Sequence, residues 1–368
     1  MEANKTRRRV CVLFGGISPE HDISVKSALY ALKSLRSAGI ESFGYYLDRN
    51  NHPAGTQEIL KRVDVLREEG ILQPGSYDDL LKSGAVCSHP PDIGGLFSIL
   101  LSGRFDVVFP LFHGPGGEDG TIQGALEFLG IPFVGCGTAG SAMAMDKVVT
   151  KMLCGANGID VLEWVSFTGF EWERDGPGVV KRAERIGYPC FVKPARMGSS
   201  IGISRADDRD GLISAVQKAL GYDRKVLCER ATDAREYSVA VIGNERPEAS
   251  LAAEISLWND FYDYPAKYGP EAVDDIIPAS LNPELTRALR ETSLRAYGIL
   301  GLSGMARVDS FIEKGRVYVN EVNTIPGLGG NSLFHRMWEK TGIPPSRLFE
   351  RLIGYALELT DSKPFPSK

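Results

Sequence analysis

An alternation of apolar strands and helical patterns in the first 112 residues limits the possible folds more than any other feature. RVCVLF (9–14) has the continuous apolar character of a buried strand, and a helical pattern follows from about residue 22 to residue 37. Further strands are expected at 40–47 and 105–112, and the stretch 49–104 between them elaborates the same domain around one helical segment. Strand–helix–strand alternation of this kind predicts an open parallel sheet.

From about residue 137 the pattern changes to helices interrupted by hairpins. One helix is expected at SAMAMDKVVTKMLCGANG (141–158), a first hairpin at 191–204 and a second hairpin at 305–323. We therefore expect an α/β fold with α+β elements, in which an open parallel-sheet domain precedes two further lobes. The expected domains are 1–136, 137–232 and 233–368.

Composition narrows the class of protein. The 368 residues carry a formal net charge of -5, so there is no basic excess of the kind that binds nucleic acid. No apolar run approaches the roughly 20 residues of a membrane-spanning helix, and we expect no membrane partner. The six cysteines are scattered without a CxxC pair, and the five histidines are dispersed. These features predict a cytoplasmic protein with reduced thiols, in which any metal ion has oxygen ligands.

The second hairpin has the most informative local pattern. Alternate residues of a strand share a face, so Arg307 and Asp309 lie together on MARVDSFI. Glu321 and Asn323 lie together on RVYVNEVN for the same reason. Two carboxylates and an amide beside a basic group suit Mg²⁺, which usually keeps water and substrate phosphates among its ligands. A solvated face with cross-strand ion pairs is the plainer interpretation, but the second strand runs directly into the glycine-rich TIPGLGGNS.

Lys193 ends the first strand of the other hairpin, FVKPARMGSSIGIS (191–204). The loop that follows, 196–200, can donate several backbone and hydroxyl hydrogen bonds. Taken alone, this stretch is equally compatible with an ordinary hairpin that carries a solvated lysine.

Two loops that follow predicted strands are further candidates. GGISPEHDIS (15–24) lies where open parallel sheets bind ligands, and its Glu20 could contact a ligand or only complement the dipole of the next helix. HGPGGEDGT (113–121) exposes backbone amides just before a helix, a place suited to anions. It matches neither the dinucleotide-binding spacing nor the P-loop spacing.

Together these motifs resemble the D-alanine–D-alanine ligases, cell-wall enzymes of the ATP-grasp superfamily. The resemblance runs from about residue 9 to residue 358 and rests on seven motifs in the family's order. They are FGGISPEHDIS, HGPGGEDGTIQGALE, MDK (145–147), FVKPARMGSSIGIS, FYDYPAKY (261–268), MARVDSFI and NEVNTIPGLGGNSL (320–333). The sequence departs from the family's pattern after Pro326, because a Thr or Ser is expected near Gly329.

The resemblance implies a substrate domain followed by the two lobes of an ATP-grasp fold, and a reaction that joins two D-alanine molecules through an acyl phosphate. It further implies ATP, two Mg²⁺ or Mn²⁺ ions and a homodimer. The 196–200 loop would close over the phosphates as a flap. Glu20, Ser199, Tyr268, Arg307 and Gly327 match the family's catalytic positions, and His113, Ser332 and Leu333 match its amino-acid-binding positions. Lys147, Lys193, Ser200, Glu229, Glu236 and Lys267 match the nucleotide-binding positions, and Asp309, Glu321 and Asn323 match the metal ligands.

Three alternatives stay open at this point. The second substrate could be D-serine or D-lactate, although Tyr268 argues against D-lactate because relatives that use it carry Phe or a histidine-containing loop there. Another ATP-grasp carboxylate–amine ligase is disfavoured by GGISPEHDIS and FYDYPAKY. A catalytically inactive nucleotide-binding module would lack at least one of the phosphate, oxyanion and metal residues. Lys193, Arg307, Asp309 and Glu321 are all present.

Overall fold

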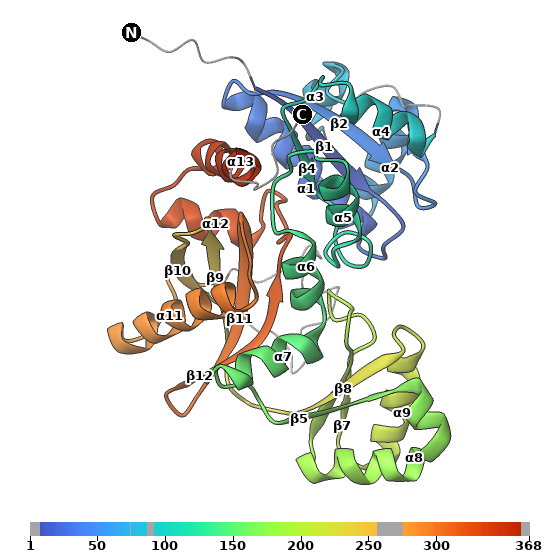
Figure 1. The fold of residues 1–368 in the computed structure, drawn as a ribbon, viewed down its shortest axis with the longest axis vertical. Helices are drawn as coiled ribbons and strands as arrows, with labels where there is room; N and C mark the ends of the chain where they lie inside the picture. The colour runs from blue at the N-terminus through green and yellow to red at the C-terminus, as the bar shows by residue number, and fades with distance from the viewer. Residues whose placement is uncertain (1–7, 74, 87–91, 256–274, 362–368) are drawn as a thin grey trace.

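The computed structural model describes residues 8–73, 75–86, 92–255 and 275–361, and the contacts given below are those within these ranges. The strands form three four-stranded sheets. Along the long axis of the molecule, the sheet built from residues 236–323 lies between the other two (Figure 1). The α/β fold expected from the sequence is confirmed.

The first sheet has the order β3-β2-β1-β4 and is parallel except at one edge. β1 pairs in parallel with β2 and with β4, which confirms the predicted parallel sheet, and the two-residue β3 adds an antiparallel edge. The strands are β1 Arg9–Gly15, β2 Glu41–Leu47, β3 Pro53–Ala54 and β4 Val107–Pro110.

Helices cover both faces of this sheet. Val10, Val12 and Phe14 of β1 point to the face covered by α1 and α2, and Cys11 and Leu13 point to the face covered by α4 and α5. Because both faces are buried, β1 is a continuous apolar run, as is usual for a strand in a parallel sheet. The helices are α1 His21–Ser37, α2 Thr56–Glu68, α4 Ile93–Leu101 and α5 Thr121–Phe128.

The stretch between β2 and β4 contains more helix than the sequence pattern predicted. α2 corresponds to the expected helix, whereas α3 (Asp78–Lys82) and α4 were missed. The sequence of α4, IGGLFSILL, is apolar at nearly every position and therefore shows no helical periodicity. Its start is set by Asp92, whose carboxylate accepts a hydrogen bond of 2.7 Å from the N–H of Gly95.

The second sheet, in the order β5-β8-β6-β7, is antiparallel throughout. β6 and β7 form the hairpin expected at 191–204. α8 and α9 pack on one face of this sheet. The elements are β5 Trp164–Thr168, α8 Gly169–Ala183, a 3₁₀ turn Glu184–Ile186, β6 Cys190–Pro194, β7 Ser204–Ala206, α9 Arg209–Leu220 and β8 Lys225–Arg230.

One expected helix is broken in two, so the prediction of a continuous helix over 141–158 was wrong. α6 (Thr138–Met145) ends before Asp146, and α7 (Lys147–Ala156) begins after it. Asp146 adopts φ −85° and ψ 100°, and its carboxylate accepts the first N–H groups of α7 as an N-cap. This cap was hidden in the sequence because no Pro or Gly marks it. The break places Lys147 at the first position of α7.

The third sheet has the order β10-β9-β11-β12 and is antiparallel. Ala306 and Val308 of β11 pack with α11, so Arg307 and Asp309 point to the opposite face. β10 was missed because its sequence, EASLAAE, is rich in alanine and lacks β-branched residues. The elements are β9 Glu236–Ile242, β10 Glu248–Glu254, α11 Pro283–Ile299, β11 Met305–Glu313, β12 Arg316–Asn323, α12 Leu333–Lys340 and α13 Pro345–Asp361.

The last helix returns to the first sheet (Figure 1). Leu348 and Leu352 of α13 are fully buried in the same core as α1 and β1. The ring of Phe349 lies 5.8 Å from that of Phe109 on β4, measured between centroids. The core beneath the first sheet is therefore shared by the first and last elements of the described chain.

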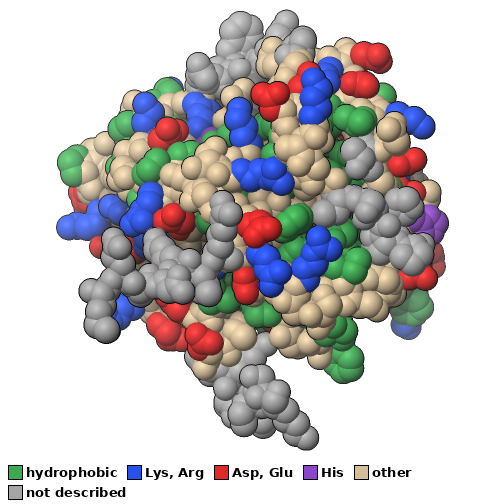
Figure 2. Space-filling model, turned by 90° about the horizontal axis from the view of Figure 1, so that it is seen from above, with side chains coloured by type: hydrophobic (Ala, Val, Ile, Leu, Met, Phe, Trp, Pro, Cys, Tyr) green, Lys and Arg blue, Asp and Glu red, His purple; other side chains and the backbone are tan. Residues whose placement is uncertain are grey.

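The distribution of surface charge and the character of the helices can be compared with what the composition predicts. On the face shown in Figure 2, basic and acidic side chains of the described residues are interspersed and are not gathered by sign. None of the helices in the described ranges combines the length and the apolar character needed to span a bilayer.

Candidate active site

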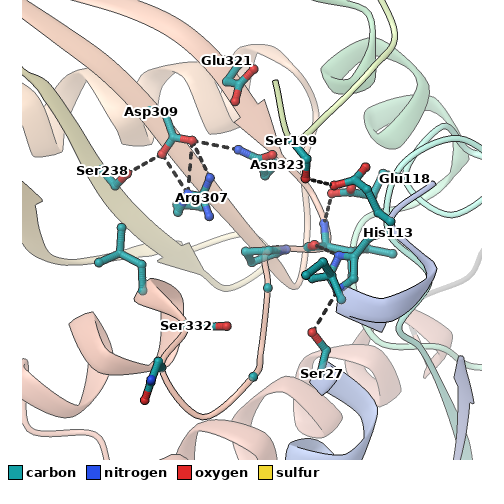
Figure 3. A pocket seen from close by; sticks show the side chains of 18 of the residues that line it. Ser27, His113, Glu118, Ser199, Ser238, Arg307, Asp309, Glu321, Asn323 and Ser332 are labelled. Atoms are coloured by element: carbon teal, nitrogen blue, oxygen red, sulfur yellow. Dashed lines mark hydrogen bonds and ion pairs between the residues drawn. The ribbon is translucent and has the colours of Figure 1, made fainter. Parts of the chain in front are cut away.

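A cavity lies where the first sheet, the loop after β6 and the third sheet meet (Figure 3). Its described lining comprises Glu20, Ile23, Lys26, Ser27, His113, Glu118, Ser199, Glu236, Ser238, Ile255, Asp275, Arg307, Asp309, Glu321, Asn323, Ile325, Pro326, Gly327, Gly329, Asn331, Ser332 and Leu333. Segments from opposite ends of the sequence therefore line one site.

The polar face of β11 and β12 borders this cavity, as the strand alternation predicted. Arg307 pairs with Asn323 and Asp309 pairs with Glu321 in the register of the two strands. The guanidinium of Arg307 donates to both oxygens of Asp309, at 2.8 Å from Nε and 2.7 Å from Nη2. Asn323 Nδ2 donates to Asp309 Oδ2 at 2.9 Å, and Ser238 donates to Oδ1. The carboxylate of Asp309 is thus held in place by three neighbours.

This face fits a divalent cation that keeps part of its ligand shell. Asp309, Glu321 and Asn323 offer carboxylate and amide oxygens, which are the ligands that Mg²⁺ prefers. No group of three or more His, Cys, Asp or Glu side chains in the described ranges is arranged to hold an ion by itself. An ion at this face would therefore also need oxygen atoms from water and from phosphate, as is usual for Mg²⁺.

Two buried lysines clamp Glu229 on the second sheet. Lys193 Nζ donates to Glu229 Oε1 at 2.8 Å, and the ammonium of Lys151 on α7 forms an ion pair with Oε2. Lys151 and Glu229 are each only 1% exposed. Burial alone would raise the pKa of Glu229, but the two ammonium groups outweigh it and hold the pKa at about 2. The carboxylate is therefore ionised at every physiological pH.

Lys147 connects α7 with the flap and with β12. Its Nζ donates to the backbone carbonyl of Met197 at 2.7 Å and lies 3.2 Å from Glu321 Oε2. Its own backbone N–H donates to Ala195 O at 2.9 Å. The N-cap at Asp146 fixes the direction in which this lysine leaves the helix.

The flap, residues 196–200, is anchored at one end and bent at the other. Arg196 is held at the anchored end by Asp223, which accepts from Nη2 at 2.6 Å and from the backbone N–H at 2.9 Å. Ser199 and Ser200 have φ of 49° and 58°, a left-handed conformation that costs roughly 1–2 kcal/mol per non-glycine residue. Ser199 Oγ donates to Glu20 Oε1, so this contact joins the bent end to the first domain.

Glu20 precedes α1 but does not cap it with its side chain. Its carboxylate instead points into the cavity between two glycines. A Cβ at Gly114 would come within 2.4 Å of Glu20 Oε2, and one at Gly198 within 2.8 Å of the same atom. The two glycines thus leave the space that the carboxylate occupies, which supports a role for Glu20 beyond complementing the helix dipole.

A second carboxylate, Glu118, lies beside Glu20. It accepts the N–H of Gly114 at 2.9 Å and the N–H of Ile325 at 3.0 Å. Burial and the neighbouring Glu20 raise the pKa of Glu118 to about 8. The N–H of Gly116 donates in the same way to Asp119 at 2.8 Å. Carboxylates of the loop therefore already use these amides of HGPGGEDGT, which does not support its interpretation as an anion site.

His113 is held in its neutral form by a chain of hydrogen bonds. Nδ1 lies 2.9 Å from the carbonyl of Ile325, which can only accept, so Nδ1 carries the proton. Nε2 therefore accepts from Ser27 Oγ at 3.0 Å, and Ser27 Oγ accepts from the N–H of Leu328 at 3.1 Å. Burial lowers the pKa of His113 to about 4. The chain ties α1 and the loop after β4 to the loop after β12.

The loop after β12 leads into α12. Ser332 precedes the first residue of α12, Leu333, and its N–H donates to Gly329 O at 2.8 Å. A Cβ at Gly327 would lie 3.2 Å from Ser332 Oγ, so the hydroxyl rests against the Gly327 backbone. Amides at the start of a helix have no partner within the helix, and Leu333, the first residue of α12, lines the cavity together with Ser332.

Comparisons with known proteins agree with this geometry. The family model described as D-ala D-ala ligase N-terminus matches residues 9–136, and the model described as D-ala D-ala ligase C-terminus matches residues 153–354. The D-alanine--D-alanine ligase of Geobacillus thermodenitrificans is 40% identical over 365 residues, covering 97% of each chain. That of Thermoanaerobacter sp. is 40% identical over 368 residues, covering 97% of this chain and 98% of the relative. The chain belongs to the D-alanine–D-alanine ligase family.

Solved structures of the ligase family show the same fold. The D-alanine-D-alanine ligase from Coxiella burnetii superposes with a TM-score of 0.77 at 29% identity, covering 96% of this chain and 95% of the other. The VanG D-Ala:D-Ser ligase from Enterococcus faecalis superposes with a TM-score of 0.78 at 29% identity, covering 95% and 99%. The ATP-grasp fold expected for the two later lobes is thereby confirmed.

The structure brings most of the ligase residues expected from the sequence to the cavity. Those that line it are Glu20, His113, Ser199, Glu236, Arg307, Asp309, Glu321, Asn323, Gly327, Ser332 and Leu333. Lys147 lines an adjoining cavity with Glu321 and Asn323. Lys193 and Glu229 lie buried on β6 and β8, and Ser200 lies in the flap. Lys267 and Tyr268 lie outside the described residues, so their positions stay predictions.

Sequence reasoning missed two buried charges of this ligase site. Lys151 follows Lys147 by one helical turn, so the helix expected over 141–158 already placed both on one face, but no spacing in the sequence connects Lys151 with its partner Glu229. Glu118 lies inside HGPGGEDGT. Only the backbone amides of this loop were interpreted, and the carboxylate that accepts one of them was not considered.

Proposed function

We propose that this protein joins two D-alanine molecules into D-alanyl-D-alanine and converts ATP into ADP and phosphate. One observation carries the proposal: the oxygen-rich face of β11 and β12, Arg307 and Glu20 border the same cavity. A terminal phosphate at that face would lie beside an amino acid held by Glu20. Forming an amide from a carboxylate at neutral pH requires activation, which ATP provides through an acyl phosphate.

The nucleotide would bind between the second and third sheets. Glu229 would accept the adenine amino group and Glu236 the ribose hydroxyls, as the family resemblance implies. Lys193, Lys147, Lys267 and Ser200 would bind the phosphates. Because Lys193 and Lys147 are paired with Glu229 and Glu321, phosphate binding exchanges one partner of each lysine for another.

The metal face would act on the same phosphates. Asp309, Glu321 and Asn323 would hold two divalent cations, Mg²⁺ or Mn²⁺, whose contribution is to neutralise charge on the phosphates. The bidentate pairing of Arg307 with Asp309 and the contact from Ser238 keep the Asp309 carboxylate oriented.

The first D-alanine would bind on the side of the first sheet. Glu20 would hold its ammonium group, and Ser199, already bonded to Glu20, would complete a hydrogen-bonded triad with Tyr268. His113 lies nearby and, being neutral, does not repel the ammonium. The carboxylate of this D-alanine attacks the γ-phosphate and forms the acyl phosphate and ADP, while the flap keeps water away.

The second D-alanine would bind at the start of α12. Ser332 Oγ and the Leu333 N–H would hold its carboxylate. Its ammonium group first loses a proton to solvent, and the neutral amine then attacks the acyl phosphate and loses a second proton as the amide forms. Arg307 and the Gly327 N–H would stabilise the oxyanion of the tetrahedral intermediate, which collapses with release of phosphate. Each group named here borders the cavity.

Purified protein with ATP, Mg²⁺ and D-alanine tests the proposal. We expect phosphate release together with D-alanyl-D-alanine, and no product from L-alanine. Phosphate release no faster than without amino acid would contradict the proposal. D-serine and D-lactate, each supplied with D-alanine, would identify a different second substrate from the mass of the product.

The cytoplasmic location and the homodimer also stay predictions from the sequence. Sedimentation analysis of the purified protein tests the second of these, with a mass of twice 40.1 kDa expected for the dimer.

A further inference from the structure

One basic side chain of the cavity is not accounted for by the roles above. Lys26 of α1 lines the cavity together with Arg307 and Ser332. Arg307 is held by both oxygens of Asp309. Lys26, in contrast, makes no hydrogen bond or ion pair with any residue of the described ranges. Burial lowers its pKa, so an anion next to this ammonium would relieve an unfavourable charge.

The position of Lys26 depends on a glycine in the loop after β12. A Cβ at Gly329 would lie 2.9 Å from Cγ of Lys26 and 3.2 Å from both Cδ and Cε. The stem of Lys26 therefore runs along the loop backbone at Gly329, and the ammonium, one bond beyond Cε, stays close to that loop. The resemblance to the family leads one to expect a Thr or Ser near Gly329.

The contact between α1 and this loop is continuous on both sides of Gly329. The N–H of Leu328 donates to Ser27 Oγ at 3.1 Å. A Cβ at Gly330 would lie 3.8 Å from the ring of Tyr30, one helical turn after Lys26. These neighbours fix the loop against α1, and Lys26 lines the same cavity as Ser332 and Leu333, the residues that open α12.

The chemistry of the cavity calls for a cation near the start of α12. Its described lining carries six acidic side chains, those of Glu20, Glu118, Glu236, Asp275, Asp309 and Glu321, of which Glu118 has a pKa raised to about 8. A second amino acid must bring its own carboxylate into these surroundings. Ser332 and Leu333 offer it only neutral donors, and Arg307 already has a carboxylate partner.

We propose that Lys26 binds the carboxylate of the second amino acid, and that the glycine at 329 is what admits the lysine to this position. The inference rests on the proposed function and adds a charged group to the second-substrate subsite. It makes Lys26 a determinant of specificity for a nucleophile that bears a carboxylate, whether the attacking group is an amine or a hydroxyl.

The test compares two nucleophiles after the same activation step. Hydroxylamine attacks the acyl phosphate of the first D-alanine, giving D-alanine hydroxamate and phosphate, and has no carboxylate. In Lys26→Met we expect hydroxamate formation within twofold of wild type. The KM for the second D-alanine should rise on the order of 10- to 100-fold, as follows from losing one hydrogen bond to a charged group. Lys26→Arg should recover part of the loss.

Lys33→Met is the matched control, because Lys33 lies two turns further along α1 with an exposed side chain and should change neither product. An equal loss of hydroxamate and dipeptide in Lys26→Met, or no loss of either, would overturn the proposal. Absence of both products with wild-type protein would instead overturn the proposed function.

The glycine is tested through its coupling to the lysine. Gly329→Ala should displace the stem of Lys26 and raise the KM for the second D-alanine in the same direction as Lys26→Met. In a Lys26→Ala background, where Cγ is gone, Gly329→Ala should have little further effect. Full additivity of the two changes would show that Gly329 acts independently of Lys26.

Discussion

The nucleotide side and the amino-acid side of the cavity are built differently. On the nucleotide side, three lysines already have ion-pair partners. Lys193 and Lys151 pair with Glu229, and Lys147 pairs with Glu321. On the amino-acid side, Lys26 has no partner within the described ranges. When a nucleotide binds, its phosphates have to replace carboxylates that already pair with the lysines. When the second amino acid binds, its carboxylate would give Lys26 its first ion-pair partner among the described groups.

This comparison predicts two kinds of mutational effect. Removing one member of a buried, paired network leaves another charge uncompensated, so stability and activity should fall together. Removing a group that waits for a ligand should change affinity and leave stability almost unaltered. The following changes test where each residue belongs, beginning with the largest expected effect.

Glu321→Gln should have the largest effect, because it removes a metal ligand as well as the ion-pair partner of Lys147. We expect turnover at saturating substrate to fall on the order of 10²-fold or more, the scale found when a preorganised electrostatic contact is lost. Phosphate release measures this. Asp309→Asn should behave similarly. Glu313→Gln is the control, because Glu313 lies at the other end of β11 and pairs with Arg230. Wild-type turnover in Glu321→Gln would show that this face carries only structural ion pairs.

His113 should give the amino-acid side a pH-dependent stability. Its pKa is about 4 when folded and about 6.5 when unfolded, so between these values the unfolded chain binds more protons. The free energy of unfolding should therefore fall by about 3 kcal/mol as the pH drops from 6.5 to 4. Denaturant titrations should show a shallower fall in His113→Gln.

His52→Gln controls for this measurement, because the His52 side chain is exposed and its loss should leave the slope unchanged. Identical slopes for wild type and His113→Gln would mean that His113 is protonated in the folded protein. The assignment of His113 as a neutral ring that accepts a hydrogen bond from Ser27 would then be wrong.

Lys151→Met should have the smallest effect of the three, because Glu229 keeps Lys193 as a partner. We expect a loss of about 1 to 2 kcal/mol in the free energy of unfolding and an increase in the KM for ATP of about tenfold. Adding Glu229→Gln in the same chain should lower stability further, because it leaves the buried Lys193 without its carboxylate partner. Arg316→Met, which opens an exposed pair with Asp160, should change neither quantity. Unchanged stability in Lys151→Met would show that the ion pair between Lys151 and Glu229 does not stabilise the fold.

The parts of the site that depend on local periodicity could be predicted from the sequence. The alternation of β11 and β12 placed Arg307, Asp309, Glu321 and Asn323 on one face, because the period of two needs no knowledge of the rest of the fold. The parallel sheet was predictable from another local pattern, the alternation of apolar strands with helical segments. Lys267 and Tyr268 remain predictions from the family resemblance.

The groups that were missed depend on contacts between distant segments. The carboxylate of Glu118 accepts the N–H of Ile325, and Lys151 of α7 pairs with Glu229 of β8. No spacing within either segment signals these contacts. The break between α6 and α7 was missed for a local reason, because the capping Asp146 interrupts a pattern that is otherwise compatible with one helix.

The return of α13 to the first sheet sets the order in which this protein can become complete during synthesis. β1, β2 and β4 leave the ribosome early, yet the apolar surface beside Phe109 is covered only when Phe349 arrives. A nascent chain therefore carries a finished sheet with an unfinished core through most of translation, which exposes it to aggregation. Once α13 docks, residues far apart in the sequence share one core, so the core beside the first sheet is complete only after residues 345–361 have been made.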